Sequence, residues 1–264
     1  PQGDAVKKKD AVFGLVAFCG SSLMVLGAAE AVLRFLPVSE GVRNRPVTNE
    51  QPVATLEPDE QLLWAQDWDF AIVNRVRVNR QGFVNDQDYE ERDRPVLAVI
   101  GDSYVEALVV PYSETLQGRL NQVARSRSAD ELGVYSWGLS GAPLSQYLIY
   151  ARHAQENHNV AGMVFVIISN DFDESLPEYA FQNTFHQFRR NGAHLELFLP
   201  REYERNATRD LLRHSALVRY AFFHLKADRL WYRLKAVAFG DREEYAGNTL
   251  ANVSAGRLDA GGEA

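Results

Sequence analysis

Three short apolar runs, each ending abruptly in a polar loop, constrain the fold of this chain more than any other feature of its sequence. The runs and their terminating loops occupy residues 96–100 and 101–103, 134–139 and 140–143, and 160–168 and 169–171. Short apolar runs bounded by chain breakers are typical of buried parallel strands. Because helix-like stretches alternate with these runs, the sequence predicts an α/β fold with a parallel sheet and helices on both faces.

One residue in each loop is a candidate for function: Ser103, Gly141 and Asn170. Parallel strands point their carboxyl ends to one side, so these residues are expected at one edge of the sheet, where ligands bind in open α/β folds. Ser103 is also expected to begin a helix, where free backbone N–H groups favour a developing negative charge. The structural alternatives are a helix cap for Ser103 and ordinary turns for Gly141 and Asn170.

Together the three residues have the chemistry that a serine nucleophile requires. Attack by the Ser103 hydroxyl on an ester carbonyl creates an oxyanion, which preorganised hydrogen-bond donors stabilise. The expected donors are the N–H of Ser103, the N–H of Gly141, which no side chain blocks, and the side-chain amide of Asn170. The next residue, Asp171, is interpreted as a structural group that holds its loop.

The order and content of these loops resemble blocks one, two and three of the SGNH (GDSL-type) hydrolases, over about residues 96–173. The amino-terminal part resembles a membrane-anchored bacterial branch of that family. The resemblance implies a flavodoxin-like three-layer α/β/α sandwich and ester hydrolysis or acyl transfer. It assigns Ser103 as the nucleophile and Gly141 and Asn170 to the oxyanion hole, and it implies no metal and no cofactor. The chain lacks a Gly-x-Ser-x-Gly elbow, which disfavours the α/β-hydrolase fold.

The chain departs from the family pattern at two places. Ser169 stands where block three usually has Gly, and no Asp has His three residues later, although the family takes its general base from such an Asp-x-x-His motif. Asp210 and His214 come nearest, one residue too far apart. We expect the motif beyond Ala264 in a longer protein, so that this chain lacks its base. The remaining histidines are interpreted as packing or surface residues: His153, His158, His186, His194 and His224.

An apolar stretch near the amino end predicts a membrane helix. Residues 11–29 contain no charged side chain, and three lysines at 7–9 precede them. About 20 apolar residues cross a bilayer, and preceding positive charges predict a cytoplasmic amino end. The expected location is therefore the cell inner membrane, single-pass, with the following chain on the periplasmic or extracellular side. A cleaved signal peptide is the second interpretation, and a buried soluble helix is the third.

The 264 residues suffice for one globular domain with additional segments, and a single Cys excludes an internal disulfide framework. We predict a cytoplasmic stub and anchor at 1–38, a linker and amino-terminal extension at 39–94, and an incomplete SGNH hydrolase-like domain at 95–264. Further local expectations are an edge strand at 72–78, a turn with Gly82 at positive φ, a solvated charged loop at 86–94, and a helix at 115–123 with Leu116, Leu120 and Val123 on one side.

The carboxyl part is expected to contain a hairpin and helices. Asn191-Gly192 predicts a tight turn between strands at 185–188 and 195–199. Residues 208–239 are apolar with helical periodicity and carry more basic than acidic side chains. Two interpretations remain open for them: core helices with a basic face in solvent, or an interfacial helix that lies on an anionic membrane or holds an acidic glycan.

The leading hypothesis is a membrane-anchored serine esterase or acyltransferase that acts on an acyl ester of a glycan, a lipid or a small molecule. A non-catalytic, membrane-anchored glycan-binding or scaffold protein is the first alternative. A soluble flavodoxin-like nucleotide binder is the second, and it is disfavoured because the loop at 101–107 is poor in Gly, Ser and Thr for phosphate binding. The net charge of −7 argues against a nucleic-acid partner.

Overall fold

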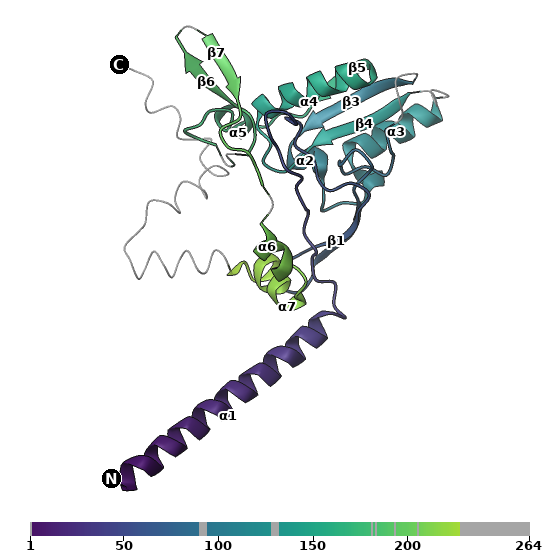
Figure 1. Ribbon diagram of the computed structural model, residues 1–264. Coiled ribbons are helices and arrows are strands. Elements are labelled where there is room, and N and C mark those ends of the chain that lie inside the picture. The colour runs from purple at the N-terminus through teal and green to yellow at the C-terminus, as the bar shows by residue number, and fades with distance from the viewer. Residues whose placement is uncertain are drawn as a thin grey trace.

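Figure 1 shows an α/β body at one end of a long amino-terminal helix. This computed structural model describes residues 2–89, 94–127, 132–180, 182, 184–192, 194–204 and 206–227, with side chains from residue 12 onward. The described elements follow in chain order: α1 (Gln2–Leu33), β1 (Gln61–Gln66), β2 (Ile72–Arg77), β3 (Pro95–Gly101), α2 (Ser103–Glu106), η1 (Tyr112–Glu114), α3 (Leu116–Ser126), β4 (Gly133–Gly138), α4 (Leu144–Asn157), β5 (Asn159–Phe165), α5 (Asn170–Asp173), β6 (Gln187–Asn191), β7 (His194–Phe198), α6 (Ala207–Leu212), α7 (Ala216–Arg219) and the π-helical turn η2 (Tyr220–His224).

The three predicted apolar strands form one parallel sheet in the order β4-β3-β5. At the carboxyl ends Gly101 of β3 pairs with Gly138 of β4, and Ile100 pairs with Phe165 of β5. The strand β5 ends at Phe165, earlier than the apolar run 160–168. The next residue, Val166, still donates its N–H to the Ile100 carbonyl of β3 at 2.9 Å. The mixed α/β class and the parallel sheet are thus confirmed.

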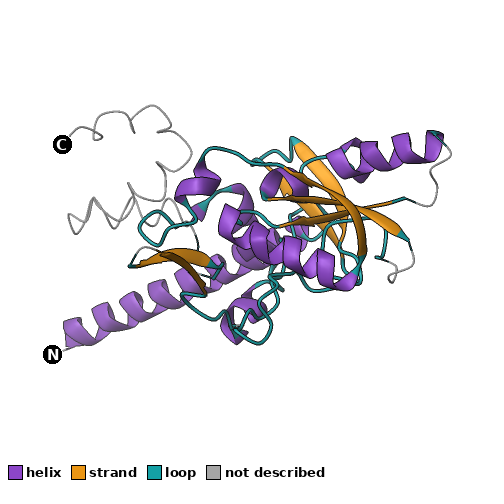
Figure 2. Cartoon of the chain, turned by 90° about the horizontal axis from the view of Figure 1, so that it is seen from above, coloured by secondary structure: helices purple, strands orange, loops and turns teal. Residues whose placement is uncertain are grey.

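Helices pack on both faces of this sheet (Figures 1 and 2). Successive side chains of a strand point to opposite faces, so the central strand β3 contributes to two separate apolar clusters. Ala98 and Ile100 pack with Tyr150 and other residues of α4, whereas Val99 packs with Val105 of α2 and with Leu120 of α3. The sheet is therefore covered by α4 on one side and by α2 and α3 on the other.

The helix α3 was predicted with the wrong inner face. Of the three residues expected on one side, Leu120 packs against the sheet, but Leu116 and Val123 are exposed. The buried positions are Gln117, Gly118, Asn121 and Ala124. Gln117 is buried because its side-chain amide donates to the Val105 carbonyl at 2.9 Å, a polar contact that periodicity of apolar residues does not reveal.

The segment before β3 wraps around the body and joins its core. The buried residues that it adds to the core cluster include Val47, Ala54, Leu56, Val78 and Phe83. The strand β2 confirms the predicted strand and pairs antiparallel with β1, which was not predicted. The expected turn is also present: Gly82 has φ of 85°, and a Cβ there would lie 2.6 Å from the Leu56 carbonyl oxygen.

The prediction of a fully solvated loop at 86–94 is wrong for Tyr89, which is buried. Its ring stacks on Tyr135 with 4.2 Å between centroids. Its hydroxyl donates to the Ser136 carbonyl and accepts from the Ser136 N–H at 3.0 Å. Tyr89 thus inserts from the charged segment into the core beside β4. Residues 90–93 of the same segment lie outside the described part of the chain.

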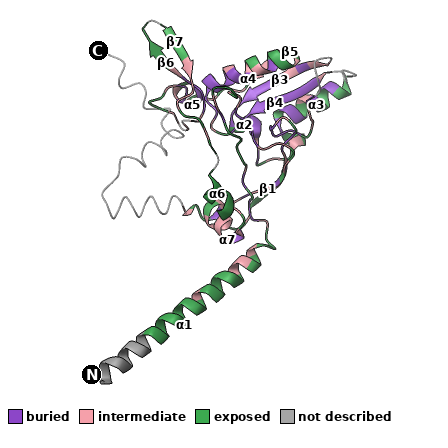
Figure 3. Ribbon diagram, in the orientation of Figure 1, coloured by how far each residue is buried: buried purple, intermediate pink, exposed green. Residues whose placement is uncertain are grey.

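The helix α1 carries an apolar window, Val12–Leu33, with a mean hydropathy of 2.0. It is long and apolar enough to cross a membrane, and none of its residues in this window is buried, as the exposed colouring of Figure 3 shows. Near its end the Glu30 carboxylate accepts hydrogen bonds from the Ser215 hydroxyl at 2.8 Å and from the N–H groups of Ala216 and Leu217 at 3.1 and 2.8 Å. These bonds fasten α1 to the start of α7.

The predicted hairpin is confirmed as β6 and β7, which pair antiparallel around Gly192 with φ of 63°. Farther along, the described part of the apolar segment 208–239 forms three short helical elements, α6, α7 and η2. The rest of that segment, from residue 228, lies outside the described residues.

Candidate functional site

The structure brings the three predicted residues together. Ser103, Gly141 and Asn170 line one cleft of about 1140 Å³ at the carboxyl edge of the parallel sheet. Each follows a different strand, β3, β4 or β5, and the three strands are neighbours. The sharing of one sheet edge, which strand polarity predicted, is therefore observed.

Ser103 is the first residue of α2, and its side chain is exposed in the cleft. The helix is capped by its predecessor: the Asp102 Oδ1 accepts from the Tyr104 N–H at 3.0 Å. The interpretation of Ser103 as the helix cap is thus wrong. The Ser103 Oγ makes one long contact, 3.4 Å to the Asp102 Oδ2, so its hydroxyl is held loosely.

Hydrogen-bond donors near Ser103 are free. Within the described part of the chain, neither the Ser103 N–H nor the Gly141 N–H donates a hydrogen bond. Gly141 has φ of 78°, the left-handed conformation that favours glycine. The Asn170 side-chain amide donates one N–H to the Glu174 Oε1 at 2.9 Å, which orients it and leaves its second N–H available.

Glu106 is a structural residue of the site that sequence reasoning missed. Its side chain is 2% exposed, and its Oε2 accepts from both the Ser140 N–H, at 2.9 Å, and the Ser140 hydroxyl. These bonds join α2 directly to the loop that carries Gly141. The only sequence signal was one carboxyl among apolar neighbours, Val105 and Ala107, directly after the Gly-Asp-Ser loop.

Burial raises the pKa of Glu106 to about 7, although the hydrogen bonds from Ser140 lower it and the charge of Asp102 raises it further. A carboxyl with such a pKa is substantially protonated near neutral pH. The state of the loop that carries Gly141 is therefore linked to one buried titrating group.

Asp171 holds the loop after β5, as its structural interpretation requires. Its Oδ2 accepts from the Ile168 N–H at 2.8 Å and from the Tyr147 hydroxyl at 3.0 Å. Burial raises its pKa, the bonds from Ile168 and Tyr147 lower it, and the charge of Asp102 raises it. The loop that presents Asn170 is thereby tied to α4 on one face of the sheet.

The walls of the cleft are largely apolar. The charged side chains that line it among the described residues, Asp102 and Glu174, are both acidic. Trp64 comes from β1, so the wrapped extension contributes to the wall. Such surroundings suit an uncharged acyl group and repel anions. The apolar lining residues are Trp64, Tyr104, Ala107, Leu108, Val109, Val110 and Ile168.

All six histidines lie in the part of the chain that the structure describes, and none of them lines the cleft. His186 is buried, with its Nδ1 3.0 Å from the Gln146 Oε1. His224 is buried where its Nε2 accepts from the Ser39 N–H at 3.1 Å. These two contacts are structural. Nor do the described residues contain a group of three His, Cys, Asp or Glu side chains with a geometry suited to a metal ion.

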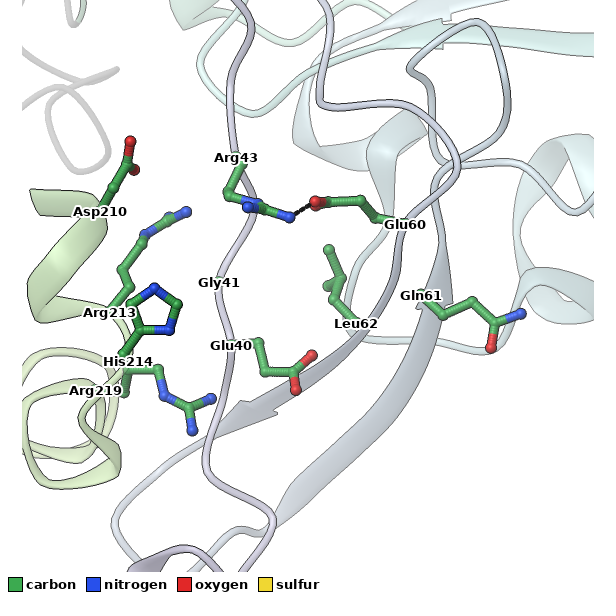
Figure 4. A pocket seen from close by; sticks show the side chains of 10 residues that line it. All are labelled: Glu40, Gly41, Arg43, Glu60, Gln61, Leu62, Asp210, Arg213, His214 and Arg219. Carbon is green, nitrogen blue, oxygen red and sulfur yellow. Dashed lines mark ion pairs between the residues drawn. The ribbon is translucent and has the colours of Figure 1, made fainter. Parts of the chain in front are cut away.

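A second cavity, of about 490 Å³, lies between the extension and the α6–α7 segment (Figure 4). Arg43 forms an ion pair with Glu60 on the wall that the extension contributes. Asp210 and His214 both line it, but no hydrogen bond or ion pair joins them in the described structure. Its described lining residues carry charges of both signs and include no serine or cysteine, so they supply no nucleophile of the kind in the first cleft. Its charged lining residues are Glu40, Arg43, Glu60, Asp210, Arg213 and Arg219.

Comparison of the chain with family models, with curated proteins and with solved structures finds no match. Inference about its function therefore rests on the residues and geometry of the cleft.

Proposed function

We propose that this chain is a membrane-anchored serine esterase or acyltransferase of the SGNH type, with Ser103 as its nucleophile. The observation that carries the proposal is the convergence of an exposed Ser103 hydroxyl with the free N–H groups of Ser103 and Gly141 and the Asn170 amide around one cleft. This is the arrangement of donors that an oxyanion requires.

The sheet order supports the finer assignment to a flavodoxin-like sandwich. Numbered along the parallel sheet, β4-β3-β5 reads second, first, third, which is how a flavodoxin-like sheet begins. The strand order reverses beside β3, and ligands of such sheets bind at that switch point. The Ser103 loop follows β3 there, and the Asn170 loop follows the adjacent β5.

In the proposed reaction the Ser103 oxygen attacks the carbonyl carbon of an ester, and its proton passes to a general base. The former carbonyl oxygen becomes the oxyanion held by the three donors. Its collapse expels the alcohol, which takes up a proton, and leaves an acyl group on Ser103. Water or a sugar hydroxyl then removes that acyl group. The acyl carrier proposed is an uncharged small molecule, lipid or glycan, because the charged lining of the cleft is acidic.

Asp102 is the titratable group in hydrogen-bond range of the Ser103 hydroxyl among the described residues. A carboxylate is a weaker base than an imidazole near neutral pH, so this chain is expected to form its acyl-enzyme slowly. Residual catalysis of about 10³- to 10⁴-fold over water is typical of serine hydrolases from which a triad member has been removed.

We further propose that α1 crosses the cell inner membrane and that the α/β body stands on its periplasmic or extracellular side. Three lysines precede the apolar window, and basic flanks favour the cytoplasmic side. The apolar surface of the helix is exposed, which suits contact with lipid.

The test is esterase activity and active-site labelling of the full chain in detergent. We expect slow hydrolysis of p-nitrophenyl acetate and stoichiometric labelling by a fluorophosphonate, both abolished by Ser103→Ala. Ser113→Ala, an exposed serine of η1 outside the cleft, serves as the matched control. Labelling that survives Ser103→Ala contradicts the proposed nucleophile.

The second candidate function is a non-catalytic, membrane-anchored glycan-binding protein. It is favoured because none of the described residues that line the cleft is a histidine. This function predicts that a neutral oligosaccharide binds in the cleft and that the fluorophosphonate does not label Ser103 at any pH. Stoichiometric labelling of Ser103 decides for the esterase.

A further inference from the structure

Three separate segments meet at the carboxyl end of α1 (Figure 1). They are residues 34–39, where the chain leaves α1, residues 67–70 at the tip of the β1–β2 hairpin, and residues 206–226. Together we name these three segments the platform. The Ser39 N–H donates to the His224 Nε2 at 3.1 Å, and the Tyr220 hydroxyl donates to the Trp68 carbonyl at 2.8 Å. The platform is therefore one hydrogen-bonded unit.

The platform lies at a defined height along α1. The apolar window Val12–Leu33 has 22 residues, so its axis is about 33 Å long, close to the ~30 Å of a bilayer's hydrocarbon core. Glu30 comes about 27 Å after Val12 on the same rise per residue. Since Ser215 and Leu217 bond to its carboxylate, the start of α7 stands where hydrocarbon gives way to headgroups.

Several large apolar side chains of the platform are exposed on the surface of the protein. Phe35 is 90% exposed and Leu211 is 71% exposed. The other exposed large apolar members are Leu36, Trp68, Leu212, Phe222 and Leu225. Aromatic and aliphatic side chains at this height are typical of segments that lie in a membrane interface.

The charge of the platform complements an anionic surface. From residue 206 to residue 226 the sequence contains one acidic residue, Asp210, and the four basic residues Arg209, Arg213, Arg219 and Lys226. Burial lowers the pKa of Arg213, the charges of Arg209 and Arg43 lower it further, and Asp210 and Tyr203 raise it. The Arg213 guanidinium donates to the Val42 carbonyl, so it is partly withdrawn from the surface. The hairpin tip adds exposed Asp67 and Asp69, and segment 34–39 adds Arg34, which pairs with Glu30, so the unpaired positive charge is concentrated in segment 206–226.

We infer that the platform docks on the anionic lipid headgroups of the leaflet from which α1 emerges. Its apolar side chains enter the interface while the exposed Arg209 and Lys226 contact lipid phosphates. The inference rests on the proposed crossing of the membrane by α1, and it is independent of the chemistry of Ser103. The docked platform fixes the height of the cleft above the membrane, since β1 carries both the hairpin tip and the cleft residue Trp64.

The experiment measures depth in nanodiscs with a nitroxide label on single cysteines of the full chain. Cys19, the chain's one native cysteine, reports whether α1 is in lipid. Phe222→Cys and, as a second site, Leu211→Cys report the platform, both in a Cys19→Ser background. Leu195→Cys is the matched control, because it is an exposed leucine of β7, at the end of the body away from α1 (Figure 1). Collision with oxygen indicates lipid, and collision with a water-soluble nickel chelate indicates water.

We expect labels at 222 and 211 at interfacial depth in discs containing phosphatidylglycerol, and the label at 195 in water. The double variant Arg209→Gln, Lys226→Gln should shift the docking equilibrium toward the undocked state, about five-fold for each charge removed. Discs of pure phosphatidylcholine, which carry no net negative charge, should also weaken docking. Arg190→Gln, on exposed β6, should leave it unchanged.

Three results overturn the inference and are distinguishable. If the label at 19 is in lipid while those at 222 and 211 meet the nickel chelate as 195 does, docking is wrong and the anchor stands. If the label at 19 meets the chelate, the anchor is wrong and docking falls with it. If 222 and 211 are shielded from both collision partners, a protein surface covers the platform instead of lipid.

Discussion

Replacing Glu106 by Gln tests whether a buried titrating carboxyl underlies the loop of the proposed oxyanion hole. In the folded chain burial raises the pKa of Glu106 from 4.5 to about 7. Between these values the unfolded chain has released the proton and the folded chain has kept it, so stability falls as the pH rises. Above pH ~7 both states are ionised and the loss is complete. A pKa difference of this size corresponds to about 3 kcal/mol.

Glu106→Gln keeps an oxygen that accepts from Ser140 but cannot ionise. We expect the variant to match the wild type within about 1 kcal/mol at pH 5 and to exceed its free energy of unfolding by about 2 to 3 kcal/mol at pH 8. The assay is urea unfolding in detergent at both pH values, followed by the fluorescence of buried Trp137.

The control is Glu114→Gln, a carboxyl exposed on η1, which should give the same difference from wild type at both pH values. A Glu106→Gln effect that is equal at pH 5 and pH 8 refutes the reasoning, because it shows that Glu106 does not change its ionisation on folding in that range.

Two further substitutions separate chemistry from packing. Asn170→Ala should slow labelling of Ser103 by the fluorophosphonate about 10²- to 10³-fold, the usual effect of losing one oxyanion donor. The urea midpoint should change little, because Asn170 is only partly buried. An unchanged labelling rate would show that Asn170 is not part of the site. Tyr89→Phe should lower the free energy of unfolding by about 1 to 3 kcal/mol, because the buried N–H and carbonyl of Ser136 lose their hydrogen bonds to the Tyr89 hydroxyl. Thermal unfolding at neutral pH measures this loss of stability, and a loss within experimental error contradicts that account.

The edge of the sheet that holds the candidate site could be predicted because its signals are local. Each of Ser103, Gly141 and Asn170 follows an apolar run closely, and parallel strands place their carboxyl ends together. The donors around Ser103 were predicted for the same reason. Glu106 could not be found in this way, since its burial depends on Ser140, which lies 34 residues later in the chain.

By itself the sequence determined the elements: an apolar amino-terminal helix, three parallel strands with the candidate loops at one edge, and turns at Gly82 and Gly192. Periodicity, chain breakers and strand polarity act over a few residues, so they are legible in the chain. Tertiary structure alone decided which polar side chains are buried and which distant segments meet. The hydrogen bond from Gln117 to Val105 fixes which face of α3 is buried. The hydrogen bond between Glu30 and Ser215, 185 residues later, holds α1 against the start of α7. A buried polar group is stable only where a partner satisfies it, and that partner is supplied by the folded chain rather than by its neighbours in sequence.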